Sequence, residues 1–334
     1  DAKEQKSEDT KGSEESASSE EIPANQNLLT GVLDLTEGAI GKRPVAVMVN
    51  NVDPAMPQYG VGKADIIFEI PVEGDATRFM ALYGDYTAVP KICAIRSFRA
   101  YFPALSEGFD AFYVNWGSDD TIGEYIASLN LDQIDGISDG SGLFGRDQAR
   151  LSAGYDLEHT GYFDGTQFAS VVQSRGLRTD IEEDKKDAAF SFYGLNEQVK
   201  PDGEDCQKVD INFGAARATL TYDEAKKVYV KDLNGKPQID GNTGEQLAFT
   251  NVFVLETSIT VRDEIGHKEV DWDGASDSVG YYISNGGVQK IHWSKEEKNE
   301  QSRLKFYDQN GKEIKINRGK SYIAVNYADQ ATFQ

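Results

Sequence analysis

The residue types best suited to chemistry are concentrated between Pro57 and Tyr101. Two acids there, Glu69 and Glu73, lie four residues apart within or beside an apolar stretch, so a regular strand would place them on one face. Two carboxylates that face a cleft can act as general acid and base, whereas a carboxylate in a strand buried on both faces is costly unless it is paired. The sequence therefore predicts either a buried ion-pair network or a polar ligand site.

Three arginines, Arg78, Arg96 and Arg99, follow these acids closely. A guanidinium group presents a planar fork of donors that suits a protein carboxylate and equally suits a bound phosphate, carboxylate or sugar. The three arginines are therefore candidate ligand-binding residues, and their role as structural partners of Glu69 and Glu73 stays open as the alternative.

Other arrangements carry less chemical information. Trp116 ends an apolar stretch and is suited to stacking on a sugar ring, although a core tryptophan is the simpler interpretation. Ser97 lacks the GxSxG surroundings of a hydrolase nucleophile, and Gly140–Gly145 lacks the Lys-Ser/Thr that completes a phosphate loop. The three histidines and two cysteines show no ligand spacing, so neither a metal site nor a cofactor is predicted.

The charge balance excludes a class of partner. Fifty-six acidic residues against 34 Lys and Arg give a formal net charge of −22, which leaves no basic surface for nucleic acid or for anionic lipid headgroups.

Two cysteines, Cys93 and Cys206, are too few for a disulfide scaffold. We expect two buried free thiols, and a bridge between them stays open.

The elements that position these residues fall into two groups, and together they predict an α+β fold. Residues 27–200 alternate strand-length apolar stretches with helix-length stretches, which is typical of a layered α/β domain with a mixed sheet. The predicted strands are Arg43–Asn50, Ala64–Val72, Arg78–Tyr86 and Ala111–Trp116, and the predicted helices are Ala100–Glu107, Thr121–Leu129 and Thr166–Arg175.

Beyond a charged, turn-rich linker that ends at Asp205, residues 205–334 change to short alternating stretches separated by Asn-Gly and Asp-Gly turns. About eight such strands predict a β-rich C-terminal domain, either sandwich-like or a curled antiparallel sheet. The clearest hairpin turn is Asp308–Lys312.

Residues 1–26 predict a disordered acidic tether. The segment Asp1–Glu21 has no aromatic or branched aliphatic residue, and its eight acids and five serines cannot bury enough apolar area to offset the entropy of ordering. Such a segment ahead of a folded domain is typical of a surface protein that a lipid holds on the membrane, and an ordinary disordered tail is the alternative.

Several long stretches make the chain resemble the YerB-like lipoprotein family of Gram-positive bacteria, whose function is unknown. The stretches are RPVAVMVNN, PQYGVGKADIIFEIPVEGDATRF and AIRSFRAYF, followed by YVKDLNGKPQIDGNTGEQLAFTNVFV, GYYISNGGVQKIHWSK and YDQNGKEIKINRGKSYIAV. The resemblance covers nearly all of the chain from Leu28 onward. It implies two domains, a removed signal peptide, a lipid-bearing cysteine ahead of Asp1 and a location on the outer face of the cell membrane.

The resemblance also implicates two further residues. Members of the family tend to follow an arginine-containing segment with a Pro-His-Asn motif, whereas this chain has Arg146 and then Glu158-His159-Thr160. His159 alone keeps its side chain from that motif, so it is a candidate acid/base or ligand residue, with a structural histidine as the alternative. Arg146 joins the candidate ligand-binding residues.

Two functions from different classes fit these observations. We favour a cell-envelope binding or scaffolding lipoprotein that contacts a cell-wall component or an envelope protein and reaches the membrane through its N-terminal anchor. The alternative is an envelope enzyme acting on wall glycan or an anionic polymer, with Glu69 or Glu73 as acid/base, the arginines binding substrate and His159 assisting. Whether the chain is an enzyme stays open at this point.

Overall fold

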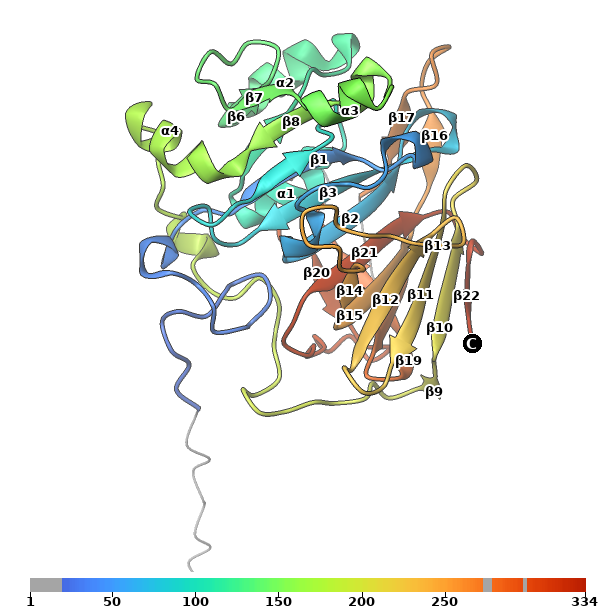
Figure 1. Cartoon of the computed structure of the whole chain (residues 1–334). Coiled ribbons are helices and arrows are strands. Elements are labelled where there is room, and N and C mark those ends of the chain that lie inside the picture. The colour runs from blue at the N-terminus through green and yellow to red at the C-terminus, as the bar shows by residue number, and fades with distance from the viewer. Residues whose placement is uncertain (1–19, 273–277, 297–298) are drawn as a thin grey trace, which may run out of the picture.

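The computed structural model describes residues 20–272, 278–296 and 299–334 (Figure 1). Most of the predicted acidic tether, residues 1–19, therefore lies outside the described residues. Within the described ranges, no helix is both long and apolar enough to cross a bilayer.

One mixed sheet of 11 strands contains strands from both halves of the sequence. Its spatial order is β20 (Lys305–Tyr307), β19 (Gly287–Ser294), β18 (Val279–Ser284), β15 (Asn251–Glu256), β21 (Ser321–Asn326), β2 (Ile66–Pro71), β3 (Thr77–Tyr83), β1 (Val45–Asn50), β5 (Phe112–Asn115) and β6 (Gln133–Asp135), with β9 (Glu204–Asp205) paired to β19. The halves join where β2 pairs in parallel with β21, seen as blue beside red in Figure 1.

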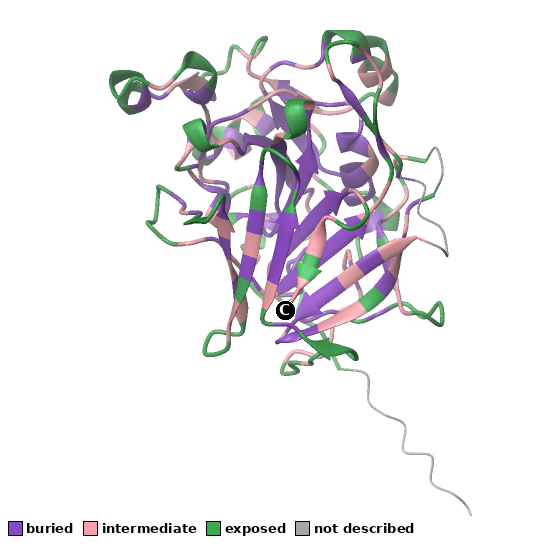
Figure 2. Cartoon of the chain, turned by 90° about the vertical axis from the view of Figure 1, so that its right-hand side faces the viewer, coloured by how far each residue is buried: buried purple, intermediate pink, exposed green. Residues whose placement is uncertain are grey.

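The centre of this sheet is buried on both faces, as β1 illustrates. All six of its residues, VAVMVN, are buried. Val45, Val47 and Val49 belong to one core cluster and Ala46 and Met48 to the other, as the alternation of side chains along a strand requires. A continuous apolar stretch is typical of such doubly covered strands, and Figure 2 shows the buried strands at the centre of the molecule.

A second sheet, of six strands, packs on one face of the first. It is antiparallel, in the order β13 (Lys236–Pro237), β12 (Val228–Leu233), β11 (Arg217–Asp223), β10 (Lys208–Asn212) and β22 (Ala331–Phe333), with β14 (Ala248–Phe249) paired to β12. In β11, buried Ala218 and Leu220 alternate with more exposed threonines, which is the pattern of a strand with one face in a core. These buried side chains share a cluster with those of β1 and β3.

Short elements complete the fold. They are the helices α1 (Phe102–Ser106), α2 (Gly123–Leu129), α3 (Gln148–Ser152) and α4 (Phe168–Ser174), the three-stranded sheet of β4 (Lys91–Cys93), β8 (Gly161–Asp164) and β7 (Phe144–Arg146), and the hairpin of β16 (Ile259–Val261) and β17 (Lys268–Val270). Phe102 and Leu105 of α1 lie in the second core cluster, on the face of the large sheet opposite the six-stranded sheet.

The predicted fold class, α+β with a mixed sheet followed by a β-rich region, is confirmed. Each strand and helix predicted within residues 27–200 has a counterpart that differs by a few residues at its ends. The predicted hairpin at Asp308–Lys312 is also present, with the Asp308 N–H donating to the Lys312 carbonyl. The sequence pattern did not reveal that strands from residues 27–200 and 205–334 would form one continuous sheet.

Candidate functional site

Glu69 lies inside the protein, between the two large sheets. Its side chain is fully buried in β2 and accepts hydrogen bonds from the Tyr322 and Thr77 hydroxyls at 2.8 Å each and from Asn51 Nδ2 at 3.3 Å. Its cationic partner is Lys231 of β12, whose Nζ lies 3.3 Å away. The predicted arginine partners are therefore replaced by a lysine from the other half of the chain, and Glu69 is part of a buried ion pair.

Glu73 lies in different surroundings from Glu69. Strand β2 ends at Pro71, and Glu73 begins the 3₁₀ turn Glu73–Asp75, so the expected shared face does not form. Both carboxylate oxygens of Glu73 accept from the Arg99 guanidinium, with Nε to Oε2 at 3.0 Å. Burial raises the pKa of Glu73, but the bonds to Arg99 outweigh burial and leave that pKa below its ordinary value. The predicted Glu–Arg partnership is thus found at this pair.

Arg78 lies behind this pair, almost fully buried. Its Nη1 donates to the Ser97 carbonyl at 2.9 Å, while its Nε has no partner among the described residues. Burial, together with the neighbouring guanidinium groups of Arg99 and Arg96, lowers the pKa of Arg78 to about 9. Arg78 therefore adds positive charge beneath the surface that Arg96 occupies.

Three of the predicted ligand-binding residues meet in one surface hollow of about 290 Å³, which we call the arginine pocket. It is lined by Ile95, Arg96, Trp116, Arg146, Leu157 and Glu158. Arg96 follows β4, Trp116 follows β5 and Arg146 ends β7, so three separate strands position the three side chains. Arg99 and Arg78 are not among its lining residues.

In the arginine pocket, the Arg146 guanidinium stacks on the Trp116 ring. The Arg146 guanidinium lies 4.3 Å from the centre of the Trp116 ring, and its Nη1 donates to the Leu157 carbonyl at 2.7 Å. Arg96 Nη1 lies 3.2 Å from Glu158 Oε2. Two glycines, Gly136 and Gly161, allow the indole to pack directly on the backbone, since a Cβ on either would come within 3.0 Å of it.

His159 adjoins the pocket but is buried. Its Nδ1 lies 2.8 Å from Asn50 Nδ2 and its Nε2 lies 3.6 Å from Glu158 Oε1. Burial lowers the pKa of His159, an effect that the charge of Glu158 partly opposes. The ligand atoms of Asp156, Glu158 and His159 fall within 4.8 Å of one another, a spacing that a cation could use, but Glu158 already pairs with Arg96 and we assign no metal here.

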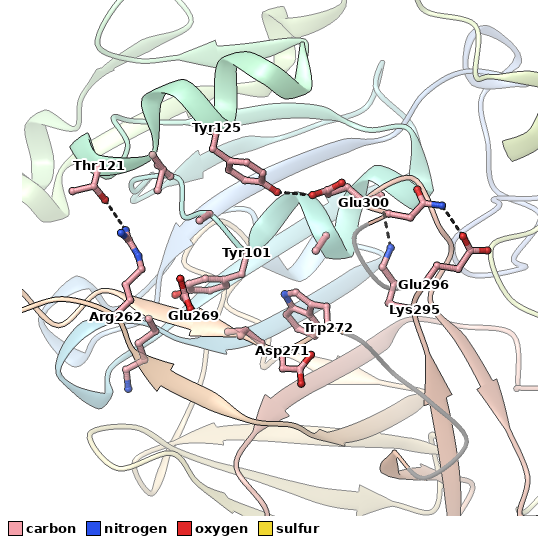
Figure 3. A pocket seen from close by; sticks show the side chains of 16 residues that line it. Tyr101, Thr121, Tyr125, Arg262, Glu269, Asp271, Trp272, Lys295, Glu296 and Glu300 are labelled. Atoms are coloured by element: carbon pink, nitrogen blue, oxygen red, sulfur yellow. Dashed lines mark hydrogen bonds between the residues drawn. The ribbon is translucent and has the colours of Figure 1, made fainter.

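A larger hollow of about 430 Å³, the junction pocket, lies where the two halves of the chain meet (Figure 3). One wall comes from α1 and from the start of α2, and the other comes from β17 and the segment after β19. Tyr101 and Trp272 lie at its centre. The sequence motifs did not predict this pocket, because its walls come from stretches that are more than 130 residues apart.

Comparison with known proteins places the chain in a family. Residues 29–178 match the N-terminal domain, and residues 209–323 the C-terminal domain, of the protein of unknown function DUF3048. The chain belongs to the DUF3048 family. The matched segments correspond to the two halves described above, so each pocket lies within or between segments that characterise DUF3048 proteins.

The relatives agree with this assignment. The chain is 29% identical over 270 residues to the Bacillus subtilis (strain 168) protein named "Putative lipoprotein YerB", covering 79% of this chain and 76% of the relative. It also resembles the crystal structure of the Bacillus subtilis YerB protein, with a TM-score of 0.77, 26% identity, and coverage of 92% of this chain and 98% of that one. The family resemblance seen in the sequence is therefore confirmed.

Proposed function

We propose that this DUF3048 protein is an extracytoplasmic lipoprotein that binds an anionic group of a cell-envelope component in its arginine pocket. The name of the Bacillus subtilis relative supports the lipoprotein character, and the acidic composition of residues 1–26 supports a spacer between the membrane and the fold. The proposed ligand group is a phosphate or a carboxylate, as found in anionic wall polymers and wall peptides.

The observation that carries the proposal is the convergence of Arg96 and Arg146 on Trp116. Two guanidinium groups face a hollow that contains one carboxylate, Glu158, whose side chain is 54% exposed. Arg96 Nε is buried and has no hydrogen-bond partner among the described residues, so the fold leaves this donor unused. A ligand anion can replace the Glu158 carboxylate on Arg96 with little loss, because exposed ion pairs contribute only about 0–1 kcal/mol.

We propose binding in preference to catalysis because the two predicted carboxylates are already engaged. Glu69 has four partners in a sealed core, and Glu73 forms two bonds with Arg99. Glycoside hydrolysis needs two carboxyl groups about 5–10 Å apart across a cleft that admits substrate. Neither Glu69 nor Glu73 lines the arginine pocket, and His159 lies beneath it.

The test is co-sedimentation of the purified chain with Gram-positive sacculi. Sacculi are used either intact or after hydrofluoric acid treatment, which removes phosphodiester-linked polymers and leaves the peptide carboxylates. A charge-assisted hydrogen bond contributes about 1.5–3 kcal/mol, so we expect Arg96→Ala and Arg146→Ala each to weaken binding about tenfold or more. Arg217→Ala, on the exposed face of β11, removes the same charge elsewhere and should bind as the wild type does.

The two kinds of sacculi identify the source of the anion. Loss of binding on acid treatment points to phosphate, and retained binding points to carboxylate. Equal binding by wild type and both arginine variants, or no binding of the wild type to either preparation, would sink the proposal.

A further inference from the structure

The junction pocket is a second cavity, and it shares no lining residue with the arginine pocket. Its volume of about 430 Å³ lies within the range of roughly 300–1,000 Å³ that is usual for ligand sites. Contacts between the halves fix its walls: Arg262 binds Asp119 and Thr121, and the Tyr125 hydroxyl donates to Glu300 Oε1 at 2.9 Å. The pocket therefore exists only when both halves are folded together.

A buried donor in this pocket lacks an acceptor. The Trp272 side chain is 7% exposed, and its Nε1 has no hydrogen-bond partner among the described residues. Figure 3 shows the indole in the middle of the lining residues, with its nitrogen on the side of Tyr101. A buried N–H without a partner costs free energy, and a bound carbonyl oxygen would satisfy it.

The two central aromatic residues are almost fully covered, with Trp272 7% and Tyr101 5% exposed, so their rings are poorly suited to stacking on a ligand. Trp272 packs edge-on against Trp293, with ring centres 6.2 Å apart and planes at 73°. Tyr101 packs edge-on against Phe102 at 5.2 Å and donates its hydroxyl to the Pro71 carbonyl. A sugar needs an exposed ring face, whereas a peptide carbonyl needs only the indole N–H, so the geometry favours a peptide over a glycan.

The charges around the pocket are unbalanced toward the negative. Arg262 and Lys268 are each neutralised by an acid outside the pocket lining, Asp119 and Asp75 respectively. Lys295 Nζ donates to the carbonyls of Glu300 and Ser302.

Three of the acids on the lining, Glu269, Glu296 and Glu300, are not paired in this way. Glu269 lies on one side of Trp272, with Glu296 and Glu300 on the other (Figure 3). None of the three forms an ion pair within the part of the chain that the structure describes. The side-chain carboxylates of Glu296 and Glu300 accept hydrogen bonds from neutral donors, namely the Asn299 amide and the Tyr125 hydroxyl.

We propose that the junction pocket binds a basic peptide segment of a partner protein. A backbone carbonyl of the segment accepts from Trp272 Nε1, and a lysine or arginine side chain pairs with Glu269 or Glu296. This site would give the envelope protein a protein partner in addition to the anionic ligand of the arginine pocket.

The test uses the full chain, immobilised, and a positional-scanning library of pentapeptides with acetyl and amide ends. We expect the wild type to retain peptides that contain lysine or arginine. Trp272→Phe keeps the ring and the charge but removes the N–H donor, so it should retain those peptides about fivefold less well. Glu269→Gln should weaken retention to a similar extent, while Glu264→Gln, an equal charge change at the tip of the same hairpin, should not.

Two controls make the result decisive. Circular dichroism and the unfolding midpoint of each variant establish that the fold is intact, and binding to sacculi establishes that the arginine pocket is unaffected. Retention of the same peptides by wild type and Trp272→Phe, or retention without preference for lysine and arginine, overturns the proposal. Glucosamine oligomers that bind the wild type but not Trp272→Phe would make the pocket a glycan site and would also overturn it.

Discussion

Lys231 Nζ lies 3.3 Å from Glu69 Oε1, and neither side chain is exposed to solvent. Glu69 belongs to the 11-stranded sheet and Lys231 to the six-stranded sheet, so this ion pair connects the two layers inside their shared core. Lys231 also donates to Gln238 Oε1 at 2.5 Å. Burial lowers the pKa of Lys231, and the charge of Glu69 opposes that shift.

Removing one member of this pair should be costly. In Lys231→Met, the Glu69 carboxylate stays buried without its cation, which costs about 3–5 kcal/mol in comparable cases. The double variant Glu69→Leu/Lys231→Met leaves no buried charge, so we expect it to regain much of that loss. Urea unfolding of the two single variants and the double variant measures the coupling. Additive losses in the double variant would show that the pair does not act as a unit.

Asp65 should make stability depend on pH. Burial raises the pKa of Asp65 to about 6 from 3.8, despite the bonds from the Gly84 N–H and Asn27 that favour the carboxylate. The folded state binds the Asp65 proton more tightly than the unfolded state does. Protonation of Asp65 therefore stabilises the folded protein, and this contribution is complete below pH 3.8 and is lost as the pH rises through about 6. The shift corresponds to about 3 kcal/mol.

Asp65→Asn carries no charge at any pH, so it should resemble the wild type near pH 4 and exceed its stability by up to about 3 kcal/mol at pH 7. Urea unfolding of both proteins at pH 4, 5, 6 and 7 measures the difference. A difference that does not change with pH would contradict the assignment.

The packing of Trp116 on Gly161 can be tested by a double-mutant cycle. A Cβ at Gly161 would lie 2.9 Å from Trp116 Cε3, so Gly161→Ala should cost about 1–3 kcal/mol and disturb the arginine pocket. In a Trp116→Ala background, the same change should cost much less. Gly123→Ala is the control, because its Cβ meets nothing within 4 Å. Equal costs in both backgrounds would mean that the indole does not fill this space.

The two cysteines should resist modification in the folded protein. Both are buried free thiols, as the sequence suggested, and burial raises the pKa of Cys93 to about 11 and also raises the pKa of Cys206. At pH 7 a thiol with that pKa is ionised in roughly one molecule in ten thousand. We expect no reaction with Ellman's reagent in buffer and two thiols in guanidinium. No thiols after denaturation would indicate a disulfide.

The sequence predicts the elements well because the signals are local. The alternation in β11 and the continuous apolar stretch of β1 report directly how many faces of each strand are covered. The pairing of β2 with β21 has no local signal, because it depends on which distant strand completes the sheet. For that reason the sequence pattern predicted an α/β domain and a β-rich domain but not that strands from both would share one sheet.

The candidate site could be predicted only in part. Arg96 and Trp116 were recognisable by residue type and Arg146 by the family resemblance, and the structure brings the three together. Lys231 was missed as the partner of Glu69, since a lysine in an alternating strand is ordinarily exposed. The junction pocket was missed because its shape arises from contacts between residues far apart in the sequence, such as that between Arg262 and Asp119.

The place of β21 in the sheet constrains how this chain acquires its structure. β21 lies between β2 and β15, yet it follows β2 by some 250 residues in the sequence. One edge of β2 therefore stays unpaired until residues 321–326 have been synthesised. Pairings of such long sequence separation slow folding, and an open edge invites association with other chains. We therefore expect a nascent chain of this protein to be most prone to association with other chains before residues 321–326 join the sheet.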